Sequence, residues 1–236
     1  MSNRFGLADA LHSQLKRLLY RIIHRLSYRL NNRRATAISH AAGFRLLVPP
    51  TVFHPRYCLT GEFFAKFIAR LDLFGKRVAD LGTGTGILAL AAARAGAASV
   101  VAIDINPHAA RAAVENARVN GFAYCVSAMC ANLFAAVAPL PLFDVILSNL
   151  PLLPVEALDL VDKAWFAGPD YRDIASVYQQ ARLRLAPGGR MYILLSSGSD
   201  LEAITALFEG AGFQARPVEE RSHLFESVLI YELSAE

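Results

Sequence analysis

The sequence holds few of the residues that build disulfide frameworks or metal centres. Its 236 residues include three cysteines, Cys58, Cys125 and Cys130, which form no CxxC pair and no cluster with histidine. This usage disfavours both a disulfide scaffold and a zinc site. It predicts a reducing compartment, which we take to be cytoplasmic, and we expect no bound metal.

The sequence also lacks a secretory leader and a long uninterrupted apolar run. The most apolar long stretch, residues 87–103, contains Arg94 and Gly96, so it is more typical of a helix followed by a strand than of a membrane span. No short apolar core followed by a small-residue cleavage site stands near the N-terminus. With 54% apolar residues the chain can bury a large core, which excludes disorder along its whole length.

The charge is unevenly distributed along the chain. Residues 1–34 contain eight Lys or Arg and one acid, Asp9, so the rest of the chain is net acidic although the total is +4. Leucine and isoleucine recur at three- and four-residue steps, which predicts an amphipathic helix over residues 8–34 and a helical extension over residues 1–43. Three roles stay open for it. It can pack on the domain, it can dock RNA, a ribosome or another acidic partner, or it can lie on an anionic membrane surface or act as an Arg-rich targeting segment.

From residue 44 to residue 236, short apolar segments alternate with amphipathic ones. We expect strands near residues 44–48, 78–81, 99–104, 124–128, 143–148 and 191–195, helices near 60–71, 87–94, 107–120, 173–185 and 201–211, and a closing hairpin within 214–233. Alternating strands and helices are typical of a parallel sheet covered on both faces. The sequence therefore predicts a doubly wound α/β domain over residues 44–236.

Three glycines stand where the strand at residues 78–81 is expected to turn into a helix. Gly82, Gly84 and Gly86 permit a sharp turn and let a ligand approach the main chain. Asp104 ends the next expected strand, where its carboxylate can accept hydrogen bonds from both ribose hydroxyls of a nucleoside. The glycine turn alone would also fit a purely structural turn, but together with Asp104 it indicates a nucleoside cofactor.

The form of the glycine turn bears on which nucleoside binds. Dinucleotide-binding folds typically carry G-x-G-x-x-G, whose helix start receives a pyrophosphate, whereas this chain has G-x-G-x-G preceded by Asp80. That form suits S-adenosylmethionine, which carries no phosphate. We therefore predict S-adenosylmethionine as the cofactor and S-adenosylhomocysteine as the product.

A short loop with an amide side chain follows the strand expected at residues 143–148. Ligands lie outside the carboxyl ends of strands in an open parallel sheet, so Asn149 of Asn149-Leu150-Pro151-Leu152 would face the methyl group of the cofactor. Its amide, with the main-chain carbonyls of Asn149 or Leu150, can accept hydrogen bonds from a substrate N–H and hold that nitrogen in line for methyl transfer. The alternative is that Asn and Pro only end the strand.

Several further segments complete a pattern with these motifs. They are Val52-Phe-x-Pro55, Thr60-Gly-Glu62, Asp104-Ile-Asn-Pro107, Asn116-Ala-x-x-Asn120-Gly, Asn132-Leu-Phe134, Phe143-Asp144, Trp165-Phe-Ala-Gly-Pro-Asp170 and Pro187-Gly-Gly189. With them the chain resembles, from about residue 44 onward, the HemK/PrmC group of class I methyltransferases, the glutamine N5-methyltransferases of translation release factors. The Trp-x-Ala-Gly-x-Asp stretch is similar to the archaeal and eukaryotic branch of that group.

The resemblance carries expectations for the fold and the site. It implies a Rossmann-like sheet of seven strands whose last strand is antiparallel, and a protein substrate such as a release factor. The catalytic residues we expect are Asn149, Leu150 and Pro151. The cofactor-binding residues we expect are Asp80, Gly82, Thr83, Gly84, Gly86, Asp104, Ile105, Asn132, Leu133 and Asn149.

Two positions differ from the pattern of the group. Its Asn-Pro-Pro-Tyr loop is Asn149-Leu150-Pro151-Leu152 here, which keeps the carbonyl at position 150 and loses the aromatic side chain at position 152. Its Gly-Asp-Leu-Phe is Ala131-Asn132-Leu133-Phe134, in which Asn132 can still accept a hydrogen bond. Two alternatives therefore stay open: methylation of a small molecule or a nucleic-acid base at nitrogen, and a cofactor-binding module without catalysis.

Overall fold

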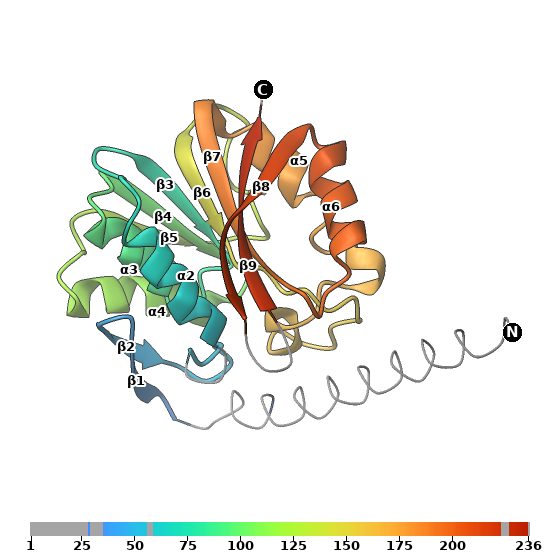
Figure 1. Ribbon diagram of the computed structural model, residues 1–236. Coiled ribbons are helices and arrows are strands. Elements are labelled where there is room, and N and C mark those ends of the chain that lie inside the picture. The colour runs from blue at the N-terminus through green and yellow to red at the C-terminus, as the bar shows by residue number, and fades with distance from the viewer. Residues whose placement is uncertain (1–27, 29–34, 56–58, 223–226, 236) are drawn as a thin grey trace, which may run out of the picture.

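The computed structural model describes residues 28, 35–55, 59–222 and 227–235 (Figure 1). Apart from Tyr28, which is helical, the helix expected at residues 8–34 lies outside the described residues. No helix in the described part of the chain is both long and apolar enough to cross a membrane.

One sheet of seven strands forms the centre of the molecule. Its strands are β3 (Arg77–Leu81), β4 (Ser99–Asp104), β5 (Val126–Cys130), β6 (Phe143–Ser148), β7 (Leu185–Ser196), β8 (Phe213–Ser222) and β9 (Ser227–Ala235). They lie in the order β5-β4-β3-β6-β7-β9-β8. The five strands from β5 to β7 are parallel, and β9 runs antiparallel to both β7 and β8. The predicted seven-stranded doubly wound sheet with an antiparallel last strand is confirmed.

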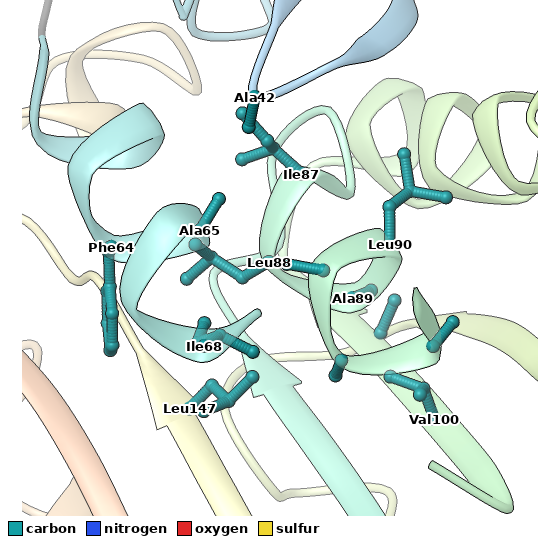
Figure 2. Close-up of a cluster of buried hydrophobic side chains, with 14 of the residues drawn as sticks. Ala42, Phe64, Ala65, Ile68, Ile87, Leu88, Ala89, Leu90, Val100 and Leu147 are labelled. Atoms are coloured by element: carbon teal, nitrogen blue, oxygen red, sulfur yellow. The ribbon is translucent and has the colours of Figure 1, made fainter. Parts of the chain in front are cut away.

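Helices cover both faces of this sheet and bury two separate cores (Figure 1). One face carries α2 (Leu59–Ile68), α3 (Ile87–Arg94) and α4 (Pro107–Val119), and the other carries α5 (Val177–Arg182) and α6 (Leu201–Gly210). Side chains alternate across a strand, so Val78 and Leu147 join the first core while Ala79 and Ile146 join the second. Figure 2 shows the first core, where side chains of α2 and α3 pack over Leu147 and Val100 of the sheet.

A small hairpin precedes the main sheet and is fastened to α4. Its strands β1 (Ala37–Ala41) and β2 (Phe44–Val48) form a separate two-stranded sheet. Asn116 donates to the main-chain O of Leu47 (2.9 Å) and accepts from its N–H (2.7 Å), and Asn120 does the same with Arg45 (2.9 and 3.1 Å). Four residues along a helix and two along a strand each span about 6 Å, so this pair of asparagines matches alternate residues of β2. The domain boundary predicted after residue 43 falls in the turn of this hairpin and stays a prediction.

The helix expected at residues 173–185 and the strand expected at residues 191–195 differ most from the structure, where they are α5 (Val177–Arg182) and β7 (Leu185–Ser196). The helix expected at residues 173–185 is shorter, because β7 begins at Leu185 and includes Pro187-Gly188-Gly189. The pairing of β6 with β7 shifts register between Phe143 and Val145, and a Cβ on Gly189 would lie 2.8 Å from the O of Ala186. The glycine therefore allows a bulge inside the strand, where the sequence pattern favoured a helix end.

Candidate active site

A cavity of about 460 Å³ lies at the carboxyl ends of β3, β4 and β6. The strand order reverses between β3 and β6, and open α/β sheets bind ligands at such a point. All the predicted site residues line this cavity except Asp80, which lies beneath the glycine turn, and Gly86, which packs against α4. The structure thus brings together residues from the ends of four strands and from the loops that follow them.

The glycine turn adopts a backbone conformation that favours glycine at three positions. Gly82, Gly84 and Gly86 have φ angles of 69°, 55° and 82°. Gly82 is anchored by its N–H, which donates to the O of Ile103 at 2.9 Å. Gly86 is the N-cap of α3, and a Cβ there would lie 2.9 Å from the Cα of Ala113. Close packing of α4 on the turn therefore requires glycine at position 86.

Asp80 supports the turn from below. Its side chain is fully buried, and Oδ2 accepts hydrogen bonds from the Thr83 hydroxyl (2.6 Å) and from the N–H of Ala89 (3.1 Å). Burial raises the pKa of Asp80 to about 7, although these two hydrogen bonds lower it. The contacts show how Asp80 holds the turn against α3.

Asp104 faces the cavity from the end of β4. Its Oδ2 accepts the N–H of Gly84 (2.9 Å), and its Oδ1 accepts the N–H of Asn106 (2.8 Å). Burial raises the pKa of Asp104, and hydrogen bonds from the main chain of Asn106, Gly84 and Ile105 oppose that shift. Each carboxylate oxygen has a further lone pair, so the group can still accept two hydrogen bonds from a ligand in a fixed orientation.

Asn149 and Leu150 follow β6 directly and adjoin the glycine turn. A Cβ on Gly82 would lie 3.1 Å from Cδ2 of Leu150, so the two loops touch across the cavity. No hydrogen bond among the described residues uses the Asn149 amide, which leaves it available to a ligand. Pro151 has no main-chain N–H, so the loop has one hydrogen-bond donor fewer than it would have with another residue there, and it keeps all its carbonyl acceptors.

A lid covers the side of the cavity next to this loop. We use the term for residues 152–166, which close on themselves through a bridge between Leu153 and Phe166. The N–H of Leu153 donates to the O of Trp165 at 3.3 Å. The cavity-lining side chains of the lid are Leu152, Leu153, Leu160, Lys163, Ala164, Trp165 and Phe166.

One wall of the cavity was not predicted from the sequence as part of the site. Thr51, Val52 and Phe53 follow β2 and line the cavity, and the Asn106 amide holds them by donating to the O and Oγ1 of Thr51 at 3.1 and 3.2 Å. The Val52-Phe-x-Pro55 motif was the available signal. Glu62 of the Thr60-Gly-Glu62 motif does not line the cavity and forms an ion pair with Lys66 at 2.7 Å.

Two histidines and the two described cysteines have structural surroundings. The side chain of His54 is buried, and the N–H of His108 donates to the Asn106 side chain at the start of α4. Among the described residues, Cys125 and Cys130 are free cysteines, and no group of three or more His, Cys, Asp or Glu side chains could hold a metal ion.

Comparison with known proteins identifies the kind of protein to which this site belongs. The family model of ribosomal protein L11 methyltransferase (PrmA) matches residues 60–164. A relative in Methanocaldococcus jannaschii, named "Putative protein N5-glutamine methyltransferase", is 31% identical over 80% of this chain and 94% of its own length. The chain spans only 28% to 47% of the length of the next three curated relatives, which are ribosomal protein L11 methyltransferases.

Solved structures with the same fold include enzymes that act on RNA and on protein. The T. thermophilus 16S rRNA N2 G1207 methyltransferase, in complex with AdoMet and guanosine, has a TM-score of 0.65 at 18% identity and covers 85% of this chain and 50% of that one. The E. cuniculi Mtq2–Trm112 complex, which methylates the eRF1 translation termination factor, has a TM-score of 0.57 at 21% identity. The match covers 79% of this chain and 99% of that one. With its seven-stranded sheet and its M. jannaschii relative, the chain belongs to the HemK/PrmC-like class I S-adenosylmethionine-dependent methyltransferases.

Proposed function

We propose that this protein binds S-adenosylmethionine in the cavity at the carboxyl ends of β3, β4 and β6 and methylates the amide nitrogen of a protein glutamine side chain. The observation that carries the proposal is the contact between the Asn149-Leu150-Pro151 loop and the glycine turn, through Leu150 and Gly82. This contact places the Asn149 amide, which is suited to hold an acceptor nitrogen, next to the glycine turn, which is suited to hold the cofactor.

The charge around the cavity fits this cofactor better than a dinucleotide. Among the described residues that line it, Lys163 is the one basic side chain, and it lies on the lid and not at the glycine turn. Asp104 and Asp173 supply two acids. The lining therefore suits a ligand with a positive sulfonium and lacks a cation at the turn for a pyrophosphate.

We assign the cofactor contacts to the residues that line the cavity. The carboxylate of Asp104, held by the N–H groups of Gly84 and Asn106, would accept hydrogen bonds from the ribose hydroxyls. Asn132 and Leu133, on the neighbouring loop after β5, would contact the adenine. Gly82 and Gly84 line the cavity and would leave room for the rest of the nucleoside, because a glycine lets the backbone approach a ligand without a side chain between them.

The chain's own residues orient the acceptor. S-adenosylmethionine supplies an electrophilic methyl group when bound and leaves as S-adenosylhomocysteine. The Asn149 side-chain oxygen and the Leu150 carbonyl would accept the two N–H groups of the acceptor amide and point the nitrogen at that methyl group. Holding the nitrogen in line supplies much of the rate enhancement, since methyl transfer is an in-line displacement.

Calorimetry and mass spectrometry on two variants test the proposal. Asp104→Ala should weaken binding of S-adenosylhomocysteine by about 1–3 kcal/mol, because it removes hydrogen bonds to a buried charged group. Asn149→Ala should keep that affinity and lose transfer of a methyl group to a glutamine-containing release-factor peptide. If the unaltered, folded protein bound neither cofactor nor product, the site assignment would be wrong.

A nucleic-acid base or a small molecule is the second candidate acceptor. Leu152 lines the cavity where the group has tyrosine, which removes a feature of the glutamine enzymes, and the fold is shared with an rRNA guanine methyltransferase. Transfer to guanosine or to RNA with no transfer to the glutamine peptide would select this candidate. Cofactor binding with no transfer to any of them would favour a binding module without catalysis.

We also propose that the basic segment of residues 1–34 helps dock an acidic partner on the acceptor side. Its one described residue, Tyr28, donates from its hydroxyl to Oδ2 of Asp159 in the lid at 2.8 Å. Replacing Arg17, Arg21, Arg25 and Arg29 by Gln should raise KM for a whole release factor, or for a ribosome-bound one, and leave KM for a short peptide unchanged. If the variant and the unaltered protein had equal KM values for the whole release factor, this role would be wrong.

A further inference from the structure

The protein has one tryptophan, and it lies in the wall of the cavity. Trp165 follows the short 3-10 helix Asp162–Ala164, and its main-chain O accepts the N–H of Leu153. Its ring packs on Phe53 with 4.9 Å between centroids. The lid and the loop after β2 therefore hold the indole between them.

The indole N–H of Trp165 is buried and has no hydrogen-bond partner. Within the described residues, only two other buried side-chain atoms share this condition, Oγ of Ser39 and Oδ1 of Asp80, and neither residue lines the cavity. A buried donor without a partner lowers the stability of the fold. Such a cost at the wall of a ligand cavity is explained if the ligand supplies the missing acceptor.

The chemistry of the indole restricts what that acceptor can be. An indole N–H donates and cannot accept, so it pairs with an oxygen and disfavours an NH₂ group. Phe53, which packs on the indole, is apolar, and so are Leu152, Leu160 and Phe166, which line the same cavity. A carbonyl oxygen that enters among them loses its water and needs a donor from the protein.

We infer that Trp165 Nε1 donates a hydrogen bond to the carbonyl oxygen of the acceptor amide and is a specificity-determining residue. The inference rests on the proposed function. The two ends of a side-chain amide have nearly the same shape, and turning it over would place oxygen where nitrogen must react. Asn149 and Leu150 accept from the nitrogen end while Trp165 donates to the oxygen end, so the site selects one orientation.

The single tryptophan allows a direct spectroscopic test. In the ¹⁵N-labelled full-length protein with S-adenosylhomocysteine, one indole N–H signal reports on Trp165 alone. A glutamine-containing release-factor peptide should move its proton signal downfield and slow its exchange with solvent. The same peptide with norleucine in place of glutamine fills a similar volume without an oxygen and should produce neither change. Equal responses to the two peptides would overturn the inference, because packing alone would respond to both.

The variant Trp165→Phe keeps an aromatic ring against Phe53 and removes the N–H. It should raise KM for the glutamine peptide about tenfold, leave the affinity for the norleucine peptide and for S-adenosylhomocysteine unchanged, and fold at least as stably as the unaltered protein. An unchanged KM, or equal weakening of both peptides, would assign Trp165 a packing role only.

The outcomes separate the inference from the proposed function. Methyl transfer to the glutamine peptide without a shift of the indole signal would contradict the role of Trp165 and support the proposed reaction. No transfer and no indole shift with that peptide removes both.

Discussion

A substitution at Gly86 allows the loss of stability caused by backbone strain to be measured separately from the loss caused by a steric clash. Gly86 and Gly121 have the same φ angle of 82°, a conformation that L side chains rarely adopt. A Cβ at Gly121 would meet no atom within 4 Å, whereas a Cβ at Gly86 would lie 2.9 Å from the Cα and 3.0 Å from the Cβ of Ala113. Replacing each glycine by alanine therefore applies the same strain at both positions and adds a clash at only one.

The expected magnitudes follow from these distances. A non-glycine residue in the left-handed conformation costs about 1–2 kcal/mol, so Gly121→Ala should lower the free energy of unfolding by about that much. Gly86→Ala should lower it by about 1–3 kcal/mol more, because the added methyl group meets the backbone of α4 and the helix must shift to relieve the clash. At about 2–4 °C per kcal/mol for a chain of this size, the difference is measurable by thermal unfolding.

Urea unfolding followed by circular dichroism, without added cofactor, is the assay. The unfolding free energy of both variants should depend on urea concentration with the same slope. The difference between their midpoints, multiplied by that slope, then gives the loss of stability caused by the clash. Ala113→Gly on the Gly86→Ala background should restore part of the loss, because it removes the methyl group of residue 113 from the clash and leaves the backbone of α4 in place. Equal midpoints for Gly86→Ala and Gly121→Ala would refute the packing of α4 on the turn.

Further predictions concern the groups that support the site. The folded-state pKa of Asp80, about 7, lies above its ordinary value of 3.8, so its contribution to stability is full below pH 3.8 and is lost as the pH rises through 7. Between pH 4 and 8 the free energy of unfolding should fall by up to about 4 kcal/mol from this group, and Asp80→Asn should flatten the profile; an equally steep profile in the variant would contradict the shift. Asn116→Ala should destabilise the protein by about 2–4 kcal/mol, because it leaves both main-chain groups of Leu47 without a partner. Asn120 is only partly buried, so Asn120→Ala should cost about 1 kcal/mol or less. Equal losses of unfolding free energy for the two variants in urea would contradict an effect of burial.

The cofactor half of the site could be predicted because its chemistry is local in sequence. The glycines of the turn follow β3 directly, Asp104 ends β4, and parallel strands bring their carboxyl ends to one edge. The hydrogen bonds of Asp104 with the N–H groups of Gly84 and Asn106 then follow from short segments. Spacing along the chain was enough to place these residues together.

The N-terminal hairpin and its wall of the cavity could not be predicted in the same way. The hairpin turns at Ala42-Gly43, both with positive φ angles of 50° and 80°, where Asn-Gly or Asp-Gly would have signalled a turn of this type. Its place in the fold depends on Asn116 and on Asn106, which bind residues 69 and 55 positions away. Long-range pairing of a polar side chain with main chain leaves little trace in a single sequence.

The two halves of the cavity differ in what a substitution can change. The cofactor half is built into the sheet: Gly86 touches α4, Asp80 joins the turn to α3, and Asp104 binds the main chain of two loops. The acceptor half lies on a lid held by main-chain hydrogen bonds, such as those from Leu153 to Trp165 and from Ala167 to Leu153, and by the side chains of Asp159 and Asp162, which accept main-chain N–H groups within the lid. Side chains there can change without disturbing the sheet. The leucine at position 152, where the group has tyrosine, falls on this half, so we expect this chain to differ from its relatives in the acceptor it selects more than in the cofactor it binds.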